Sequence, residues 1–117
     1  MTVIDWDSAI EQCGDDEEFL RELLLDLKGE LHLQLHKIHD EIERNILDHE
    51  SRSKIERAAH VIKGTSANLM CHELKEASTA LERHAKKCLK PGLVDLYFNF
   101  QKAQQNFHQL LAEKSIF

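Results

Sequence analysis

The sequence predicts an all-α protein: an antiparallel four-helix bundle with an additional short N-terminal helix. Only one proline and four glycines occur among 117 residues, and 31% of the residues are charged, which leaves little material for the turns of an all-β fold. Apolar residues also recur at spacings of three and four over several long stretches, as the core-facing side of a helix requires. A chain of this length suits one core, so residues 1–117 are expected to form a single domain.

The first two helices are expected in the N-terminal part of the chain. Residues 4–13 form a short amphipathic segment that Gly14 closes. A long helix is expected from about Asp16 to Leu47, because acidic residues stand at its start, where they complement the helix dipole, and apolar residues follow with helical spacing. The ten apolar positions are Phe19, Leu20, Leu23, Leu24, Leu27, Leu31, Leu35, Ile38, Ile42 and Ile46.

Three further helices complete the bundle, and the short connections between them imply antiparallel neighbours. The first of these is expected to begin between residues 48 and 53, where several residues are possible caps, including Ser53 with Glu56 as a capping box. The next ends before the KPG sequence at 90–92, since proline disfavours helix in the preceding residue. The last runs from Leu93 to about Lys114. The helix that ends before KPG has an apolar stripe of Leu74, Ala77, Leu81, Ala85 and Cys88.

The composition excludes several classes of function. A formal net charge of −6 argues against a nucleic-acid partner, because phosphate neutralisation needs a surplus of clustered lysine and arginine. No apolar run approaches the roughly 18 to 20 residues that span a bilayer, and the acidic start does not resemble a secretion signal. Three cysteines without a CxxC pair make a disulfide framework unexpected. We therefore expect a cytoplasmic protein, or also a nuclear one in a eukaryote, with no membrane partner.

Gly64 stands within the stretch AAHVIKGTSANLM, residues 58–70, where glycine in a helix interior costs on the order of 1 kcal/mol relative to alanine. On a helical wheel, the side opposite His60 collects an apolar stripe that crosses Gly64 without a phase break, which favours an unbroken helix through residue 69. A helix stop is the alternative, because lysine followed by glycine is a common C-terminal sequence. The stripe comprises Ile55, Ala58, Ile62, Thr65 and Leu69.

The face around His60 has a composition that suits phosphoryl chemistry. Lys63 follows one turn later, where its ammonium can offset the roughly two negative charges of a phosphoryl group on the imidazole. Gly64 and Ala67 continue the face with almost no side chain and leave room for that group and for a second protein. That protein would supply the metal and the acceptor. The remaining residues of this face, expected to contact the partner, are Ser53, Glu56 and Arg57.

The stretch HVIKGTSANL at residues 60–69, with LKEASTALE at residues 74–82, closely resembles the histidine-containing phosphotransfer (HPt) domain of multistep two-component signalling. The upstream DW and GDDEEFLRELL resemble the same family, so the likeness covers most of the chain. The resemblance implies that His60 accepts the phosphoryl group, Lys63 helps to hold it and Gly64 leaves room for it. It also implies no kinase or phosphatase activity, no resident cofactor, and receiver-domain partners that carry the Mg²⁺. We expect a monomer.

Two positions depart from the family pattern. Met70 stands where many members have glycine after the Asn-Leu pair. The family often supports the histidine with a polar residue of the following helix, and Glu82 is the nearest position by spacing. Its charge would oppose a phosphate, so the supporting residue is left unassigned.

Three other interpretations compete with phosphotransfer. His32, His36 and His39 fall on one face of the long helix, as a metal site would require, but no ligand from a second helix can be identified, which favours a solvated flank. Cys88 is in phase with Leu81 and is expected to be a buried structural thiol rather than a nucleophile. The remaining alternative is a non-catalytic helical interaction module in which His60 is a surface residue.

Overall fold

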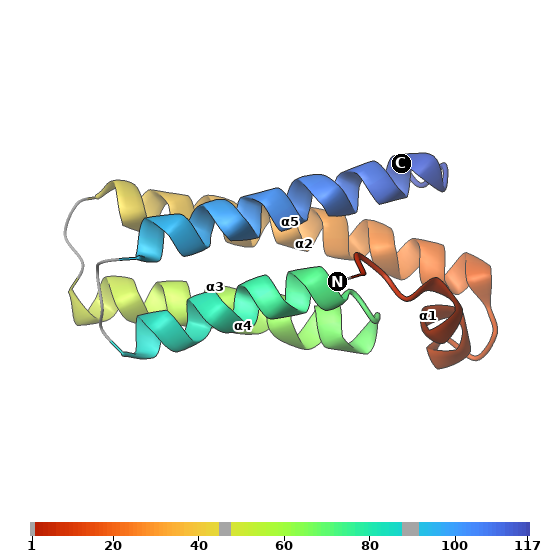
Figure 1. The fold of residues 1–117 in the computed structure, drawn as a ribbon, viewed down its shortest axis with the longest axis horizontal. Helices are drawn as coiled ribbons and strands as arrows, with labels where there is room; N and C mark the ends of the chain where they lie inside the picture. The colour runs from red at the N-terminus through yellow and green to blue at the C-terminus, as the bar shows by residue number, and fades with distance from the viewer. Residues whose placement is uncertain (1, 45–47, 88–91) are drawn as a thin grey trace.

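The computed structural model describes residues 2–44, 48–87 and 92–117. It confirms the all-α prediction: a short helix precedes four long antiparallel helices, and the described residues contain no strand (Figure 1). The turn between α3 and α4 lies at one end of the bundle, and the N-terminal helix lies at the same end, where α2 begins (Figure 1). The helices are α1 (Trp6–Gln12), α2 (Glu17–Glu43), α3 (His49–Asn68), α4 (His72–Lys86) and α5 (Leu93–Glu113).

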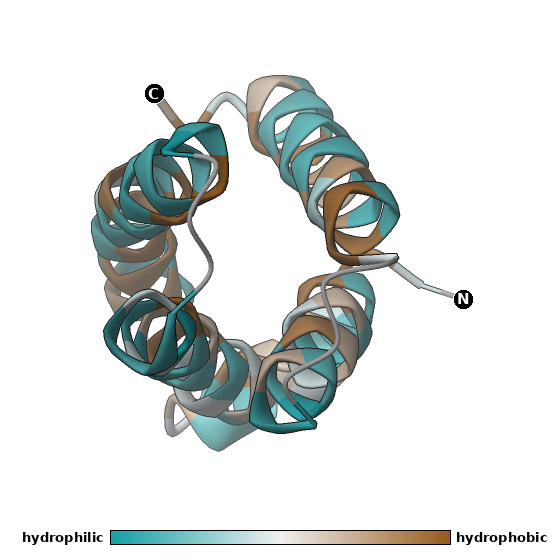
Figure 2. Ribbon diagram, turned by 90° about the vertical axis from the view of Figure 1, so that its left-hand side faces the viewer, coloured by the Kyte–Doolittle hydropathy of each residue, from teal (hydrophilic) through white to brown (hydrophobic). Residues whose placement is uncertain are grey.

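The core lies along the axis of the bundle, where the apolar faces of the helices meet (Figure 2). In α2 most of the expected stripe is buried from Leu20 to Ile38, whereas Leu23 and Ile42 are partly buried. Phe19 was expected in this stripe, but it is 46% exposed, because it is rotated by about 100° from Leu20 around the helix. Ile46, the last expected member, lies outside the described residues. The largest fully buried side chains include Phe100, Phe107, Leu24, Leu31, Ile38, Ile55, Ile62, Leu74, Leu81 and Leu111.

The starts of α1, α2 and α3 are set by aspartate caps. Asp16 accepts a hydrogen bond from the Phe19 amide at 3.0 Å, so α2 begins at Glu17. Asp48 accepts one from the Ser51 amide at 2.8 Å, so α3 begins at His49. The expected start between residues 48 and 53 is confirmed, but the capping box of Ser53 and Glu56 is wrong, because Asp48 caps the helix and Ser53 lies inside it.

The third helix continues across Gly64 to Asn68, which confirms the unbroken-helix interpretation. It then ends in a Schellman motif: the Cys71 amide donates to the Ser66 carbonyl at 2.9 Å and the Met70 amide donates to the Ala67 carbonyl at 3.3 Å. Met70 has a φ of 57°, a left-handed conformation that glycine adopts more easily than any other residue. The family's glycine at this position thus has a physical reason, and this chain places a strained methionine there.

The N-terminal segment is fastened to the end of the bundle by polar and aromatic contacts. The Asp5 amide donates to the Met70 carbonyl at 3.0 Å, which ties the start of α1 to the turn between α3 and α4. The Trp6 ring lies 4.5 Å from the Lys114 ammonium, and Arg21 donates to the Lys114 carbonyl at 2.7 Å. The short helix therefore closes this end of the bundle.

Burial raises the pKa of the Cys71 thiol to about 12, so this residue stays protonated and unreactive. Cys13 is partly buried, and Cys88 lies outside the described residues. None of the described helices is long and apolar enough to cross a bilayer.

We predict that Met70→Gly gives a more stable protein than Met70→Ala. Both variants lose the same partly buried side chain, but only glycine relieves the left-handed strain, which is worth about 1 kcal/mol. Chemical denaturation followed by circular dichroism measures the difference. At Ala67, which is helical, glycine should instead be the less stable residue. If Met70→Gly is less stable than Met70→Ala, the left-handed backbone at this position is not strained.

Candidate functional site

His60 lies on the solvent-facing side of α3, as the helical wheel predicted. Its side chain is 66% exposed, whereas Ile55 and Ile62 on the opposite side of the helix are fully buried. The imidazole is therefore accessible to a second protein while the backbone that carries it is held by the core.

A buried carboxylate from α4 lies beside the ring. Glu82 is only 3% exposed, and both of its oxygens are 3.4 Å from Nδ1 of His60. The ammonium of Lys63 lies 3.0 Å and 3.2 Å from the same two oxygens, and that of Lys86 lies 3.2 Å from Oε1. The Glu82 carboxylate of α4 therefore contacts His60 and Lys63 of α3 and Lys86 of its own helix.

Glu82 is ionised at neutral pH. Burial alone would raise the pKa of this carboxyl group, but hydrogen bonds from Lys63, Lys86 and His60 outweigh burial and hold the pKa below its ordinary value. An ionised carboxylate only accepts hydrogen bonds, so the neutral imidazole is expected to carry its proton on Nδ1. Its other nitrogen, Nε2, then presents a lone pair.

Sequence reasoning left Glu82 unassigned, yet the sequence contains a signal that could have identified it. Leu74, Ser78, Leu81 and Ala85 are buried along α4, and Glu82 is in phase with Ser78, one turn earlier. An acidic residue on a buried stripe needs a cationic partner, because an unpaired buried charge is strongly unfavourable. Lys86, one turn later, and the lysine at position 63 supply that charge.

The expected clearing beside His60 is present. Gly64 is exposed and lies within the helix, and a Cβ atom built on it meets no other atom within 4 Å. Ala67 is partly exposed one turn further along. The surface beside the ring is thus low and open.

The three residues expected to contact a partner differ in their surroundings. Arg57 is exposed, whereas Ser53 and Glu56 are partly buried. A carboxylate oxygen of Glu56 lies 4.0 Å from the Lys86 ammonium, so Glu56 belongs to the edge of the charged network as well as to the His60 face.

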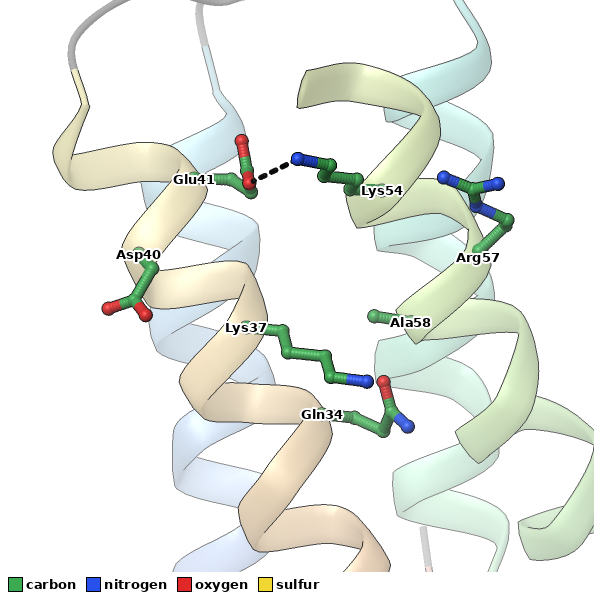
Figure 3. Close-up of a pocket in the computed structure, with 7 residues that line it drawn as sticks. All are labelled: Gln34, Lys37, Asp40, Glu41, Lys54, Arg57 and Ala58. Atoms are coloured by element: carbon green, nitrogen blue, oxygen red, sulfur yellow. Dashed lines mark ion pairs between the residues drawn. The ribbon is translucent and has the colours of Figure 1, made fainter. Parts of the chain in front are cut away.

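A pocket of about 540 Å³ lies beside the site, between α2 and α3, and does not include His60 (Figure 3). Lys37 reaches across it from α2 toward α3, and an ion pair of 3.6 Å joins Glu41 to Lys54 (Figure 3). The Ser51 hydroxyl donates to Glu41 at 2.7 Å; this hydrogen bond, with Lys54 and Arg44 nearby, lowers the pKa of Glu41. The ion pair between Glu41 and Lys54 and the Ser51 hydrogen bond thus join α2 to α3 at this pocket.

The histidine row lies away from this site, between α2 and α5. His32, His36 and His39 are exposed and line a small pocket of about 200 Å³ with Tyr97. His36 and His39 lie 3.5 to 3.6 Å from carboxylates of Asp40 and Glu43. Within the described ranges, no group of three or more histidine, cysteine, aspartate or glutamate side chains is placed to hold a metal ion. That the protein needs no metal of its own stays a prediction.

Comparison with known proteins identifies the family. A family model described as Hpt domain matches residues 10–113, nearly the whole chain. No curated protein and no solved structure gives a significant match. The chain belongs to the Hpt domain family, whose members carry phosphoryl groups in two-component phosphorelays.

We predict that Glu82→Gln flattens the acid dependence of stability. Because the pKa of Glu82 is below its ordinary value of 4.5, the ionised carboxylate stabilises the fold above that value, and this contribution is lost as the pH falls through the lowered pKa of the folded state. The difference in unfolding free energy between wild type and variant should persist from pH 7 to about 5 and shrink below.

Urea denaturation at a series of pH values measures that difference. Glu76→Gln is the matched control, because Glu76 is an exposed carboxylate on the same helix and its replacement should change stability little at any pH. A constant difference between wild type and Glu82→Gln across the acid range would contradict the prediction.

Proposed function

We propose that this protein relays a phosphoryl group between the aspartates of receiver domains through a phosphohistidine at His60. The observation that carries the proposal is the contact between Nδ1 of His60 and the Glu82 carboxylate. It leaves Nε2 as an exposed nucleophile next to the Gly64 clearing and within one turn of the Lys63 ammonium.

The transfer step follows from this arrangement. The Nε2 lone pair attacks the phosphorus of an aspartyl phosphate, the bond between phosphorus and the carboxylate oxygen breaks, and the donor aspartate leaves as a carboxylate. The ring then bears a phosphoryl group on Nε2 and a proton on Nδ1, and so carries a positive charge. In the reverse direction, an acceptor aspartate attacks the same phosphorus and the ring leaves as neutral imidazole.

Glu82 supports this step from the far side of the ring. A carboxylate facing Nδ1 fixes the tautomer and stabilises the imidazolium charge that develops when Nε2 bonds to phosphorus, as a triad aspartate does for its histidine. The objection that a negative charge opposes phosphate is answered in two ways. The carboxylate faces the other ring nitrogen, and two lysines lie within 3.2 Å of it.

Lys63 offsets the negative charge of the phosphoryl group. Its side chain is 31% exposed and starts one turn from His60, so its ammonium can turn from Glu82 toward a group on the ring. This partial exposure leaves the ammonium accessible to a group on His60.

The partner in this proposal is a receiver domain of a response regulator or hybrid kinase, which docks on the His60 face and carries the Mg²⁺ and the remaining transfer groups. Gly64 and Ala67 lie at the centre of that contact, with Ser53, Glu56 and Arg57 toward one end. The protein acts as a monomeric carrier in the cytoplasm, or also in the nucleus of a eukaryote, and has no kinase or phosphatase activity of its own.

We predict that His60→Gln abolishes acid-labile phosphate and leaves the helical content unchanged, because the exposed ring contributes little to the core. Lys63→Ala should accept phosphate more slowly, with a loss of roughly 1 to 3 kcal/mol, the range for hydrogen bonds to charged groups. Incubation with a phosphorylated receiver domain and Mg²⁺, followed by gel and mass analysis, measures both.

A folded His60→Gln variant that still accepts acid-labile phosphate would overturn the assignment of this residue. If the wild type accepts none from any receiver domain of its source organism or from a small phosphoryl donor, the protein is a helical interaction module instead.

Gly64 provides a prediction in which stability and transfer change in opposite directions. Gly64→Ala should stabilise the helix by a few tenths to about 1 kcal/mol, since the added methyl group meets open space. Gly64→Gln should also keep or raise the melting temperature, but its side chain would occupy the clearing and obstruct both phosphoryl group and partner. Thermal denaturation and transfer assays on the two variants measure these effects. Normal transfer by the glutamine variant would show that the clearing has no role.

A further inference from the structure

Lys86 lies at the C-terminal end of α4, outside the stretches 60–69 and 74–82 that resemble the family motif. Its side chain is 55% exposed, and its ammonium is 3.2 Å from Oε1 of Glu82 and 4.0 Å from Oε1 of Glu56. Glutamate four residues before lysine is the favourable order of such a pair in a helix, and a cation is favoured in the last turn. The position of the ammonium beside Glu82 is therefore well supported locally.

The charges at the site explain why a second lysine matters. One carboxylate, Glu82, faces two ammonium groups, those of Lys63 and Lys86. A phosphoryl group on His60 adds about two negative charges. With Lys63 alone, the buried carboxylate would keep only the positively charged ring as a partner once that ammonium turned to the phosphoryl group, and losing a partner is unfavourable for a buried charge.

We propose that Lys86 is a positioning residue for phosphotransfer that acts through Glu82. It keeps the carboxylate paired before and after His60 is phosphorylated, so that Lys63 is free to turn to the phosphoryl group. The inference rests on the proposed function and adds to it a residue that does not itself contact the phosphoryl group.

The variants Lys86→Met and Lys86→Arg test the charge, and each is also made together with Glu82→Gln. Lys87→Met is the matched control, because it removes a neighbouring exposed lysine at the same end of α4. Phosphoramidate serves as the donor: its P–N bond breaks, ammonia leaves, and a bond forms between phosphorus and Nε2 of His60. The rate of labelling is followed by mass spectrometry, and the return of phosphate to a receiver domain is followed in a second assay.

We expect Lys86→Met to slow labelling by roughly threefold to tenfold, as the loss of a partly exposed charge contact allows. Lys86→Arg and Lys87→Met should stay near the wild-type rate. In the Glu82→Gln background, replacing Lys86 should no longer change the labelling rate. The neutral amide can still accept a hydrogen bond from the Nδ1–H group of His60, but it needs no counter-charge. A role confined to helix stability would give the same change in both backgrounds and would follow the melting temperature.

A second measurement does not depend on transfer. Titration of the Glu82 carboxyl followed by ¹³C NMR should give a higher pKa in Lys86→Met than in the wild type, and no change in Lys87→Met. An unchanged Glu82 pKa in Lys86→Met would overturn the inference.

The outcomes separate the two proposals. If wild type is not labelled on His60, the proposed function fails, and the role of Lys86 fails with it. If wild type is labelled but Lys86→Met reacts at the same rate, or Lys86→Arg does not restore the rate, only the inference about Lys86 fails. Should Glu82→Gln take up no label, the comparison of Lys86→Met with Lys86→Arg still decides whether the charge is required.

Discussion

The site depends on one buried carboxylate. Glu82 is 3% exposed and lies within 3.4 Å of an imidazole and two ammonium groups, which come from both α3 and α4. Removing a charge from water is unfavourable unless partners replace the solvent, so this carboxylate fixes where its neighbours lie. The His60 ring, 66% exposed, is thereby oriented by a buried group. A surface histidine in this position is therefore expected to carry its proton on Nδ1.

Local features of the site could be predicted from sequence because helical periodicity determines them. The wheel placed His60 opposite Ile55 and Ile62 and carried the helix across Gly64, since each residue advances by about 100°. The contact between His60 and Glu82 could not be derived in the same way, because it joins residues 22 positions apart on two helices. Sequence reasoning considered Glu82 and set it aside on the sign of its charge, without the two lysines that balance that charge.

Two smaller errors, in the cap of α3 and in the apolar stripe of α2, have a similar origin. Ser53 and Glu56 fit the pattern of a capping box, but Asp48 accepts the hydrogen bond from the Ser51 amide, so the helix begins before Ser53. Phe19 seemed to extend an apolar stripe, yet one residue of rotation places it in solvent. Met70 is a different case: its departure from the family glycine was visible in the sequence, and the left-handed φ of 57° supplies the physical reason for the family's choice.

The turn between α3 and α4, which contains Met70, has a consequence for local unfolding of the protein. His60 and Lys63 precede this turn, Glu82 and Lys86 follow it, and α3 and α4 share the most extensive contact of any helix pair in the described residues. All four groups thus belong to one helical hairpin, a unit of the kind that opens cooperatively in native-state hydrogen exchange. Partial unfolding that frees α1 or α5 would leave these groups together, so the site can persist through local openings that expose much of the core.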